Sequence, residues 1–329
     1  MKDIARDLGI SPMAVSKALR NHDDISKETR ERVMRRAAEL NYRLDWIARS
    51  MVTGRTYLVG LVLPDLMQSF FAEVAMGVTR RLAPAGYQVV ILHTQEDPRE
   101  EAASIDLLVT RKVDGLIIAS AQRGGRAEGL RELKTPYVLI DRAIHGLKAN
   151  YVGVQNEELG FLATEHLIEQ GCRRIAHLRG PAVSTSQGRF KGYKRALAKH
   201  GLKEEAGLVA DGDYTDATGY KAMQSLLALP EKPDGVFCFN DPVAVGAIHA
   251  IQEAGLSVPH DIAVIGAANM HYSDMIRVPL STVDQSSAEI GERASDLLLH
   301  CMTSEEAPEP KRILVKPKLV VRESSLRRG

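Results

Sequence analysis

The chain has 329 residues, in which 43 lysines and arginines nearly balance 42 aspartates and glutamates. Its length exceeds what one hydrophobic core usually serves and predicts two or three domains. The near-neutral total excludes a uniformly basic chain, yet residues 1–55 carry 12 basic and 8 acidic side chains, a net of +4, and the rest is mildly acidic. A basic head on an acidic body is compatible with nucleic acid at one end and a different partner at the other.

The cysteines and the N-terminus exclude several classes of protein. Cys172, Cys238 and Cys301 are odd in number and far apart, which predicts free thiols in a reducing compartment rather than a disulfide framework or a metal site. The charged start, MKDIARDLGI, does not resemble a signal peptide. No apolar run reaches the ~18 residues that a membrane span requires. We therefore expect a cytoplasmic protein with no membrane partner, metal or cofactor.

Residues 1–43 are predicted to form three short helices. Gly9 ends the first helix, because glycine adopts the left-handed conformation of a helix stop. Ser11 is a good N-cap for the second helix, and Pro12 stands at its first position, where a missing N–H costs nothing. Ser26 begins a third helix with apolar residues at helical spacing. Two short helices joined by a tight turn, with a third to cover the core, indicate a helix-turn-helix.

A helix-turn-helix places its second helix in the DNA major groove. Here that helix begins at Pro12, and its start and outward face supply the expected DNA contacts: Ser11, Pro12, Met13, Ser16, Lys17 and Arg20. Ser16 and Lys17 can hydrogen-bond bases or phosphates, whereas Pro12 and Met13 would read shape or a thymine methyl group. The alternative is a three-helix bundle that docks on protein, but a separate basic head favours DNA.

Residues 44–56, LDWIARSMVTGRT, predict one more short helix between the head and the body. Asp45 can cap it and Gly54 can end it. About eight residues are too few for a helix to be stable alone, because nucleation is costly. The segment is therefore a candidate switch that orders on DNA and frays away from it, with an inert linker as the alternative.

From Tyr57 onward, apolar segments alternate with amphipathic ones. The strand candidates are residues 57–63, 89–93, 115–120, 137–141, 175–178, 235–241 and 261–266, with a last strand in the tail from 317. Segments 70–86 and 159–171 show helical periodicity and end in glycine. Apolar strands spaced by helices predict parallel sheets covered on both faces, and roughly 270 residues of them predict two lobes.

Enzyme signatures are missing from the sequence. The histidines are scattered, and there is no Gly-x-Ser-x-Gly, His-Glu-x-x-His or phosphate-binding Gly-x-x-x-x-Gly-Lys motif. We therefore predict no catalytic residues. The second hypothesis is a solute-binding protein whose helical head docks on another protein.

The string KDIARDLGISPMAVSKALRN, followed by IARSMVTGRT, resembles the LacI/GalR family of bacterial transcription regulators. The resemblance continues through residues 180–193, 237–247, 254–266, 277–285 and the closing PKLVVRES. It implies a small all-α helix-turn-helix head, a hinge helix and an α/β core of two parallel doubly wound sheets, similar to periplasmic sugar-binding proteins. It also implies a nucleoid-associated repressor that binds a near-palindromic operator as a homodimer under allosteric control by a small-molecule effector, a sugar or sugar derivative.

The resemblance also sets the expected domain boundaries. Three segments are expected: residues 1–43 as the DNA-binding domain, 44–56 as the hinge helix and linker, and 57–329 as the effector-binding and dimerisation core. The expected lobes of the core are about 57–155 with 286–316, and about 156–285 with 317–329. Segments 70–86 and 241–255 resemble the faces that pair in dimers of the family, and the chain lacks the leucine heptad tail with which some members form tetramers.

In that family an apolar side chain from each hinge helix of the dimer wedges a central base step in the minor groove. The matching position here is Met51, since methionine is among the residues that unstack bases. Ala48 matches the small residue that lets the two helices approach, and Arg49 would approach phosphates or groove edges. The alternative for Met51 is packing at the domain junction.

Two departures from the family pattern concern the DNA end. The chain starts at Met1 without the usual Ser or Thr cap, so either the first helix is weakly capped or the true start lies a few codons upstream. The Pro-Asn that often precedes the hinge is Leu44-Asp45, in which the aspartate still serves as a cap.

Open α/β sheets bind ligands beyond the carboxyl ends of their strands. On that rule and the resemblance together, the expected effector contacts are Phe70, Phe71, Arg142, Ser186, Arg189, Tyr214, Asn240 and Asn269. Arg189 would supply a forked donor and Tyr214 would stack on a sugar face. Phe70 and Phe71 are equally typical of a core, and Arg189 has Asp213 or Asp216 as alternative partners.

Ala268 is the departure that matters most for the ligand. It takes the place of an aspartate that grips sugar hydroxyls in the family, and Asn269 follows it. A lost charge-assisted acceptor is worth about 1.5–3 kcal/mol to a polyol. His271 and Asp274 lie just beyond and are candidates to replace it. The ligand class stays open between a sugar, a sugar acid, a phosphorylated sugar and a less hydroxylated molecule.

Overall fold

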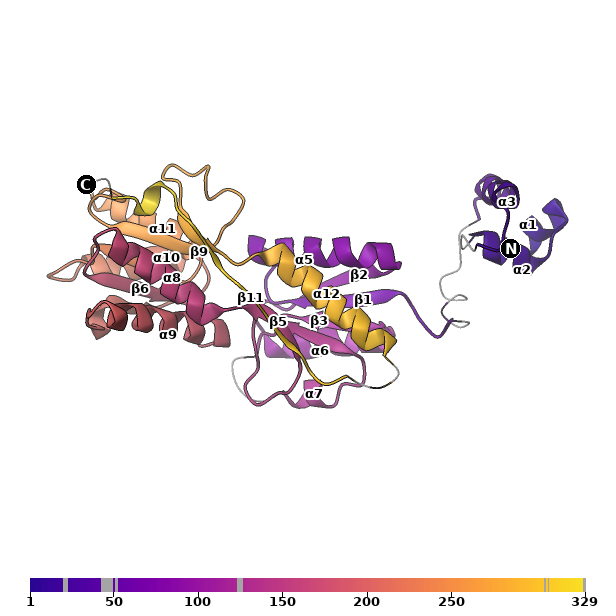
Figure 1. Ribbon diagram of the computed structural model, residues 1–329, viewed down its shortest axis with the longest axis horizontal. Coiled ribbons are helices and arrows are strands. Elements are labelled where there is room, and N and C mark those ends of the chain that lie inside the picture. Colours follow the sequence, from indigo (N-terminus) through magenta and orange to yellow (C-terminus); the bar gives the residue numbers. More distant parts are fainter. Residues whose placement is uncertain are drawn as a thin grey trace. The chain divides into compact units, whose positions relative to one another are not determined.

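The structure, a computed structural model, describes residues 1–19, 23–42, 50, 53–122, 127–304, 306 and 308–327. It divides into two compact units, Met1–Thr56 and Tyr57–Gly329 (Figure 1). The first unit contains the helical head, and the second contains both sheets.

The head has the three helices that the sequence predicts: α1 Lys2–Leu8, α2 Pro12–Leu19 and α3 Lys27–Glu39. Gly9, in the left-handed conformation with φ 63°, ends α1. The Ser11 hydroxyl accepts a hydrogen bond from the Ala14 N–H at 3.1 Å. The Ser26 hydroxyl accepts one from the Thr29 N–H at 3.2 Å. The predicted stop and both predicted caps are confirmed, and they fix where α2 and α3 begin.

A small aliphatic core holds these helices together; its buried members are Ile4, Ala5, Val15, Ala18, Val33 and Ala37. Arg36 of α3 adds a forked hydrogen bond to Asp7 of α1, with nitrogen–oxygen distances of 2.9 and 2.6 Å. That bond from Arg36 lowers the pKa of Asp7. Met1 gives α1 no side-chain cap, so the start of α1 relies on the backbone bond from the Ala5 N–H to the Met1 carbonyl.

The second unit contains two sheets, each of six strands within the described residues. The first has the order β11-β5-β4-β3-β1-β2 and is parallel throughout. Its strands are β1 Leu58–Leu63, β2 Gln88–His93, β3 Gly115–Ile118, β4 Tyr137–Ile140, β5 Asn150–Val154 and β11 Arg312–Val315. The second has the order β12-β10-β9-β8-β6-β7, in which β12 runs antiparallel to β10. Its strands are β6 Ile175–Arg179, β7 Val209–Asp211, β8 Gly235–Cys238, β9 Ala263–Ala268, β10 Ser281–Asp284 and β12 Lys318–Val320.

Helices cover the faces of each sheet and complete two lobes (Figure 1). The helices of lobe 1 are α5 Ser69–Leu82, α6 Pro98–Thr110, α7 Glu128–Arg131 and α12 Ser287–Thr303. Those of lobe 2 are α8 Asn156–Glu169, α9 Ser184–Lys199, α10 Asp216–Leu227 and α11 Asp241–Glu253. The helices pack in close pairs: a Cβ atom at Gly246 of α11 would lie 1.9 Å from the Asp216 carbonyl oxygen of α10, so only glycine permits that approach.

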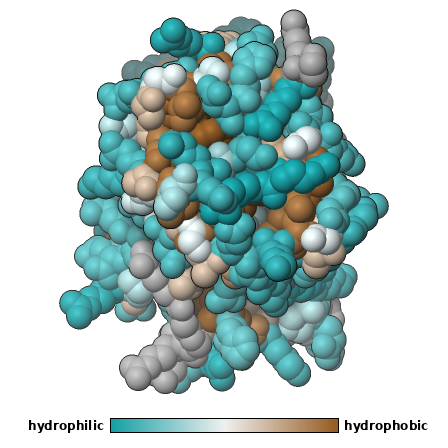
Figure 2. Space-filling view, turned by 90° about the vertical axis from the view of Figure 1, so that its left-hand side faces the viewer, coloured by the Kyte–Doolittle hydropathy of each residue, from teal (hydrophilic) through white to brown (hydrophobic). Residues whose placement is uncertain are grey.

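The chain passes between the lobes three times, after β5, after β10 and after β11. All eight predicted strands are present, while β5, β7, β10 and β11 were not predicted. The two-lobed α/β core with mainly parallel sheets is confirmed. The end of the molecule that carries lobe 2 has a mainly hydrophilic surface with separate apolar patches (Figure 2).

Within the described ranges, no helix is long and apolar enough to cross a membrane. In the same residues, no group of three or more His, Cys, Asp or Glu side chains is placed to hold a metal ion.

His177 of β6 lies in an aromatic stack at the centre of lobe 2. Its ring is 4.5 Å from that of Phe237 and 5.3 Å from that of Tyr193, centroid to centroid. Its Nδ1 lies 2.9 Å from the Phe237 carbonyl, to which it donates, and its Nε2 is buried without a hydrogen-bond partner. Burial lowers the pKa of His177 to about 3.

We predict that His177 makes lobe 2 sensitive to acid. The unfolded chain takes up the proton near pH 6.5, whereas the folded chain resists it down to about pH 3. The stability that His177 contributes is therefore complete above pH 6.5 and falls by about 1.4 kcal/mol per pH unit below it. Between pH 6.5 and 5, His177 should lower the free energy of unfolding of the wild-type chain by about 2 kcal/mol, and His177→Phe should abolish this loss. Denaturant unfolding at the two pH values measures it. Phe190→Leu, in the same stack, should lower the free energy of unfolding by the same amount at both pH values. If the effect of His177→Phe were also the same at both pH values, the prediction would be refuted.

Candidate effector cleft and DNA-binding head

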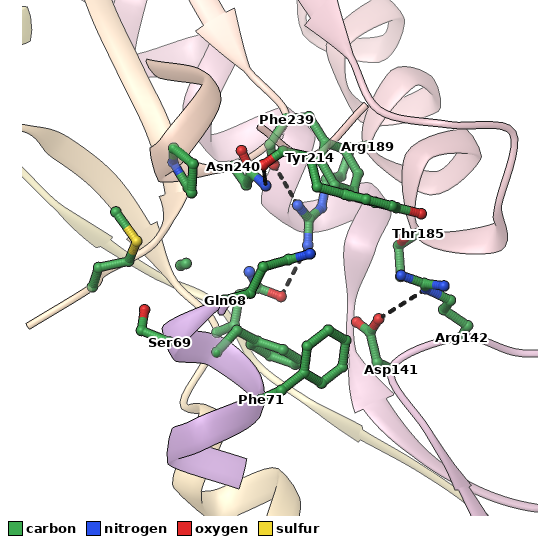
Figure 3. Close-up of a pocket in the computed structure, with 15 residues that line it drawn as sticks. Gln68, Ser69, Phe71, Asp141, Arg142, Thr185, Arg189, Tyr214, Phe239 and Asn240 are labelled. Atoms are coloured by element: carbon green, nitrogen blue, oxygen red, sulfur yellow. Dashed lines mark hydrogen bonds and ion pairs between the residues drawn. The ribbon is translucent and has the colours of Figure 1, made fainter. Parts of the chain in front are cut away.

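A pocket of about 450 Å³, counting space open to solvent, lies where the carboxyl ends of both sheets face each other (Figure 3). Lobe 1 contributes Gln68, Ser69, Phe70, Phe71, Asp141 and Arg142. Lobe 2 contributes Thr185, Arg189, Tyr214, Phe239, Asn240, Pro242, Ala268 and Met270, and Gln285 lies where the chain returns to lobe 1. A pocket lined from both lobes at strand ends is where an α/β sheet protein binds a small ligand.

Arg189 of α9 is the most constrained charge in this pocket. Its side chain is 2% exposed and lies with its guanidinium carbon 4.4 Å from the centre of the Phe239 ring. Nη2 donates to Gln285 Oε1 at 2.9 Å and Nη1 donates to the Phe239 carbonyl (Figure 3). Nε donates to Asn156 Oδ1 at 3.1 Å. Burial lowers the pKa of Arg189 to about 10, so the group stays charged at neutral pH. The predicted alternative partners, Asp213 and Asp216, do not bind it.

These bonds use three of the five N–H groups of a guanidinium. One N–H on each terminal nitrogen of Arg189 has no bond to the described residues. A ligand oxygen in the pocket could accept both.

Asp141 and Arg142 follow β4 and face the pocket from lobe 1 (Figure 3). Burial raises the pKa of Asp141, and the charges of Arg142 and Arg189 oppose that shift. Burial also acts against the charge of Arg142, but its forked bond to Glu96, at 2.7 and 2.6 Å, leaves the pKa of Arg142 raised. The pocket therefore holds two cations of different kinds: Arg142 forms ion pairs with Glu96 and Asp141, whereas Arg189 is bonded to neutral acceptors.

Aromatic rings supply the apolar part of the lining. Phe70 and Phe71 of α5 meet edge to face with ring centres 5.0 Å apart, and Tyr214 and Phe239 of lobe 2 lie 5.7 Å apart. Phe71 is 1% exposed and belongs both to the core of lobe 1 and to the pocket lining. Phe70 and Phe71 are therefore core residues that also line the pocket, and their contact with an effector stays a prediction.

Asn240 and Asp241 follow β8 and shape the lobe 2 wall. Asn240 lines the pocket, but its amide also caps α11 through the Val243 N–H at 2.9 Å and donates to the Tyr214 carbonyl at 3.0 Å. Asp241 is fully buried beneath the lining and accepts three hydrogen bonds from the segment that follows β9 and from β10.

Four of the expected residues lie outside the lining. Ser186 is buried and donates to the Gly180 carbonyl at 2.9 Å, because its side of α9 faces the loop after β6. Asn269 accepts a hydrogen bond from Arg322 at 2.9 Å, since its left-handed backbone turns the amide toward the C-terminal segment. His271 and Asp274 are exposed and do not line the pocket, so the carboxylate in the lining is Asp141 from the opposite lobe.

Several lining residues were not predicted as contacts: Gln68, Ser69, Thr185, Phe239, Pro242, Met270 and Gln285. Gln285 follows β10, a strand whose sequence STVD is too polar and short to be recognised. Ala268 does line the pocket, and its φ of 153° is a conformation that side chains rarely adopt.

On the head, the start of α2 is open to solvent. Ser11 and Pro12 are exposed and Met13 is 66% exposed, as a DNA-reading face requires. Ser16 and Lys17 are half-buried, and Lys17 forms an ion pair with Asp24. Four of the expected DNA contacts lie outside the described residues: Arg20, Ala48, Arg49 and Met51. The expected hinge helix lies largely outside them as well; at its far end, Gly54 has a φ of 69° and donates to the Ser50 carbonyl at 2.8 Å.

Two families match this chain. The pattern of "Bacterial regulatory proteins, lacI family" covers residues 1–45, and that of "Periplasmic binding protein-like domain" covers residues 164–325. The chain is 31% identical to the HTH-type transcriptional repressor PurR of Actinobacillus pleuropneumoniae, over 98% of this chain and 97% of that protein. It is 33% identical to the HTH-type transcriptional repressor CytR of Escherichia coli, over 99% and 96%. The chain belongs to the lacI family.

Solved structures agree with that assignment. The lac repressor dimer bound to operator and an anti-inducer has a TM-score of 0.86 and 25% identity, over 99% of this chain and 98% of that chain. A complex of the transcriptional regulator CelR with cellobiose has a TM-score of 0.75 and 30% identity, over 98% of both chains. This lacI-family chain is a DNA-binding transcriptional regulator and not an enzyme, as its sequence predicts.

Proposed function

We propose that this chain is a cytoplasmic repressor that binds a near-palindromic operator as a homodimer, and that a small ligand in the interlobe pocket controls its affinity for DNA. The observation that carries the proposal is one chain with a capped helix-turn-helix and a two-lobed pocket lined from both sides. A ligand that contacts both lobes changes their equilibrium, and a coupling of about 1–3 kcal/mol to the DNA end is enough for control. We also propose that residues 44–56 form the hinge helix and linker, and that the two lobes have the boundaries that the resemblance implies.

We further propose that the ligand is an uncharged sugar or sugar derivative. Two carboxylates, Glu96 and Asp141, offset the two arginines of the pocket, and both form ion pairs with Arg142, so an anionic ligand would find little surplus positive charge. The rings of Phe71 and Tyr214 suit the apolar face of a sugar, and a similar regulator forms a cellobiose complex. In a thermal shift screen we expect neutral sugars to raise the unfolding temperature and sugar phosphates to leave it unchanged.

Pairing of two copies is supported by exposed apolar side chains on the second unit. Met67 and Met76 belong to the α5 region, and Tyr272 and Met275 to the segment after β9; their exposed fractions are 92%, 61%, 39% and 79%. A dimer that covers them would satisfy the two-fold symmetry that an operator demands.

A salt titration of DNA binding tests the proposed function against a solute-binding protein with a protein-docking head. The full chain is titrated against labelled random-sequence duplexes by fluorescence anisotropy at 50–200 mM salt. A repressor should lose about 10³-fold or more in affinity over this range, because each phosphate contact releases counterions. A flat response, or no binding at the lowest salt, would contradict the regulator.

Met51 tests the hinge assignment that the resemblance implies. We expect Met51→Ala to weaken binding to the operator about 10- to 100-fold, because a lost wedge removes the kinked DNA that improves the contacts. Binding to random DNA should change less than 2-fold. Equal losses of affinity for both duplexes would contradict the wedge and indicate that Met51 packs at the domain junction.

A further inference from the structure

Residues 141–143 place three consecutive groups against lobe 2. Arg142 lies with its guanidinium carbon 5.0 Å from the centre of the Tyr214 ring, within the range of a cation–π contact. The Ala143 N–H donates to the Ser184 hydroxyl of α9 at 2.9 Å. The charge of Asp141 acts on Arg189 of the same helix. Residues 142 and 143 of lobe 1 thus make a cation–π contact and a hydrogen bond to lobe 2.

The backbone of this segment is bent in a way that a chain adopts only under constraint. Asp141 has a φ of 60°, and the Arg142 N–H donates to the Ile140 carbonyl at 2.6 Å, which makes Asp141 the centre of a three-residue turn of the rare, strained type. Strain of this kind clusters at ligand clamps and switches. At this bend the side chains of Asp141 and Arg142 lie beside each other, with Oδ2 and Nε 3.5 Å apart.

Arg142 is also anchored on the side away from lobe 2. Both terminal nitrogens bind Glu96, and Nη1 additionally donates to the Ser120 carbonyl at 3.2 Å. Glu96 is held by its own left-handed backbone, with φ 60°, and by a bond from its N–H to the Pro64 carbonyl at 3.2 Å. Ala121, next to Ser120, is held by the buried carboxylate of Glu101, which accepts a hydrogen bond from the Ala121 N–H at 2.5 Å. Arg142 is therefore a fixed cation of lobe 1 and not a free side chain that waits for a ligand.

We propose that Arg142, Ala143, Tyr214 and Ser184 form an interlobe latch that holds the two lobes together through protein contacts alone, and that Arg142 serves this latch rather than binding the effector as a donor. The proposal rests on the proposed effector role of the pocket and adds how the pocket closes. Tyr214 belongs to both the latch and the pocket lining, so a ligand that displaces its ring acts on the latch directly.

The Ala143 amide reports on the latch, because its proton can exchange with solvent only when the bond to Ser184 breaks. Amide-resolved hydrogen exchange is measured on the full chain without DNA or added sugar. Breaking a cation–π contact of this kind should raise the exchange rate of Ala143 about 2- to 30-fold. The Leu116 amide, bonded to the Pro136 carbonyl inside lobe 1, is the internal reference for global unfolding.

Arg142→Met tests the lobe 1 side, and Tyr214→Leu tests the lobe 2 side without leaving Glu96 unpaired. We expect faster exchange at Ala143 relative to Leu116 in both variants, and no further gain in the double variant. Arg179→Met is the matched control, since Arg179 stacks on Phe190 at 4.5 Å wholly within lobe 2. Unchanged relative exchange in Tyr214→Leu, or an equal rise in the control, would overturn the latch. Because neither DNA nor effector is present, the outcome does not depend on the proposed function.

Discussion

Arg189→Met should lower the free energy of unfolding of the second unit by about 3–5 kcal/mol, the usual cost of removing one partner from a buried charged network. The guanidinium joins three parts of the chain at once: Asn156 at the first crossover between the lobes, the Phe239 carbonyl after β8, and Gln285 at the second crossover. Its loss leaves those acceptors buried and removes the cation that stands nearest to Asp141 in lobe 2.

Arg189→Lys should recover only part of this stability, because a single ammonium cannot reach three acceptors in a fixed fork. The measurement is denaturant unfolding of the full chain. Arg195→Met is the matched control: Arg195 lies on the same helix, pairs with Glu157 and Glu158 at the surface, and should cost under about 1 kcal/mol. An Arg189→Met variant as stable as this control would contradict the central place given to Arg189.

Asp241→Ala should lower the free energy of unfolding by roughly 3–5 kcal/mol. The reason is that three buried donors lose their acceptor, and each unsatisfied donor costs about 1–3 kcal/mol before the structure relaxes. The carboxylate accepts the Thr282 hydroxyl at 2.6 Å, the Met270 N–H at 3.0 Å and the Ser273 hydroxyl at 3.0 Å. These bonds hold the segment that carries Ala268 and Met270 into the pocket lining.

Asp241→Asn should lower the free energy of unfolding less than the alanine variant, because the amide oxygen still accepts hydrogen bonds. Some loss remains, since the amide NH2 is a donor where the carboxylate had a second acceptor. Asp274→Ala, an exposed aspartate in the same segment, should change the free energy of unfolding by no more than about 0.5 kcal/mol. Thermal unfolding of the three variants orders these effects. If Asp241→Ala matches Asp274→Ala, the buried carboxylate does not support the pocket wall.

The predictable parts of the fold share strong local signals. The head could be delimited from Gly9, Ser11 and Ser26 because helix stops and caps depend on a few neighbouring residues. Strands buried on both faces, such as LVGLVL in β1, were visible as apolar runs. The missed strands are short or mixed: β7 has three residues, and the residues of β11 alternate between exposed and partly buried before the last.

The pocket was predicted less completely than the fold, because its geometry depends on contacts between distant segments. Arg189 and Asn240 come after predicted strands, so the rule of strand ends placed them in the lining, whereas Tyr214 follows the unpredicted β7 and was expected from the resemblance. No local signal indicates that Asn269 turns to Arg322, fifty-three residues along the chain. The anchoring of Arg142 by Glu96 likewise joins two loops that the sequence leaves unrelated.

We propose that two copies of this chain read one two-fold DNA site. The most direct measurement is selection of binding duplexes from a random pool by the full chain, followed by hydroxyl-radical footprinting on the enriched sequence. We expect an enriched near-palindrome with half-sites about one helical turn apart and equal protection on both halves. Enrichment of an asymmetric single site, or no enrichment over the starting pool, would contradict it.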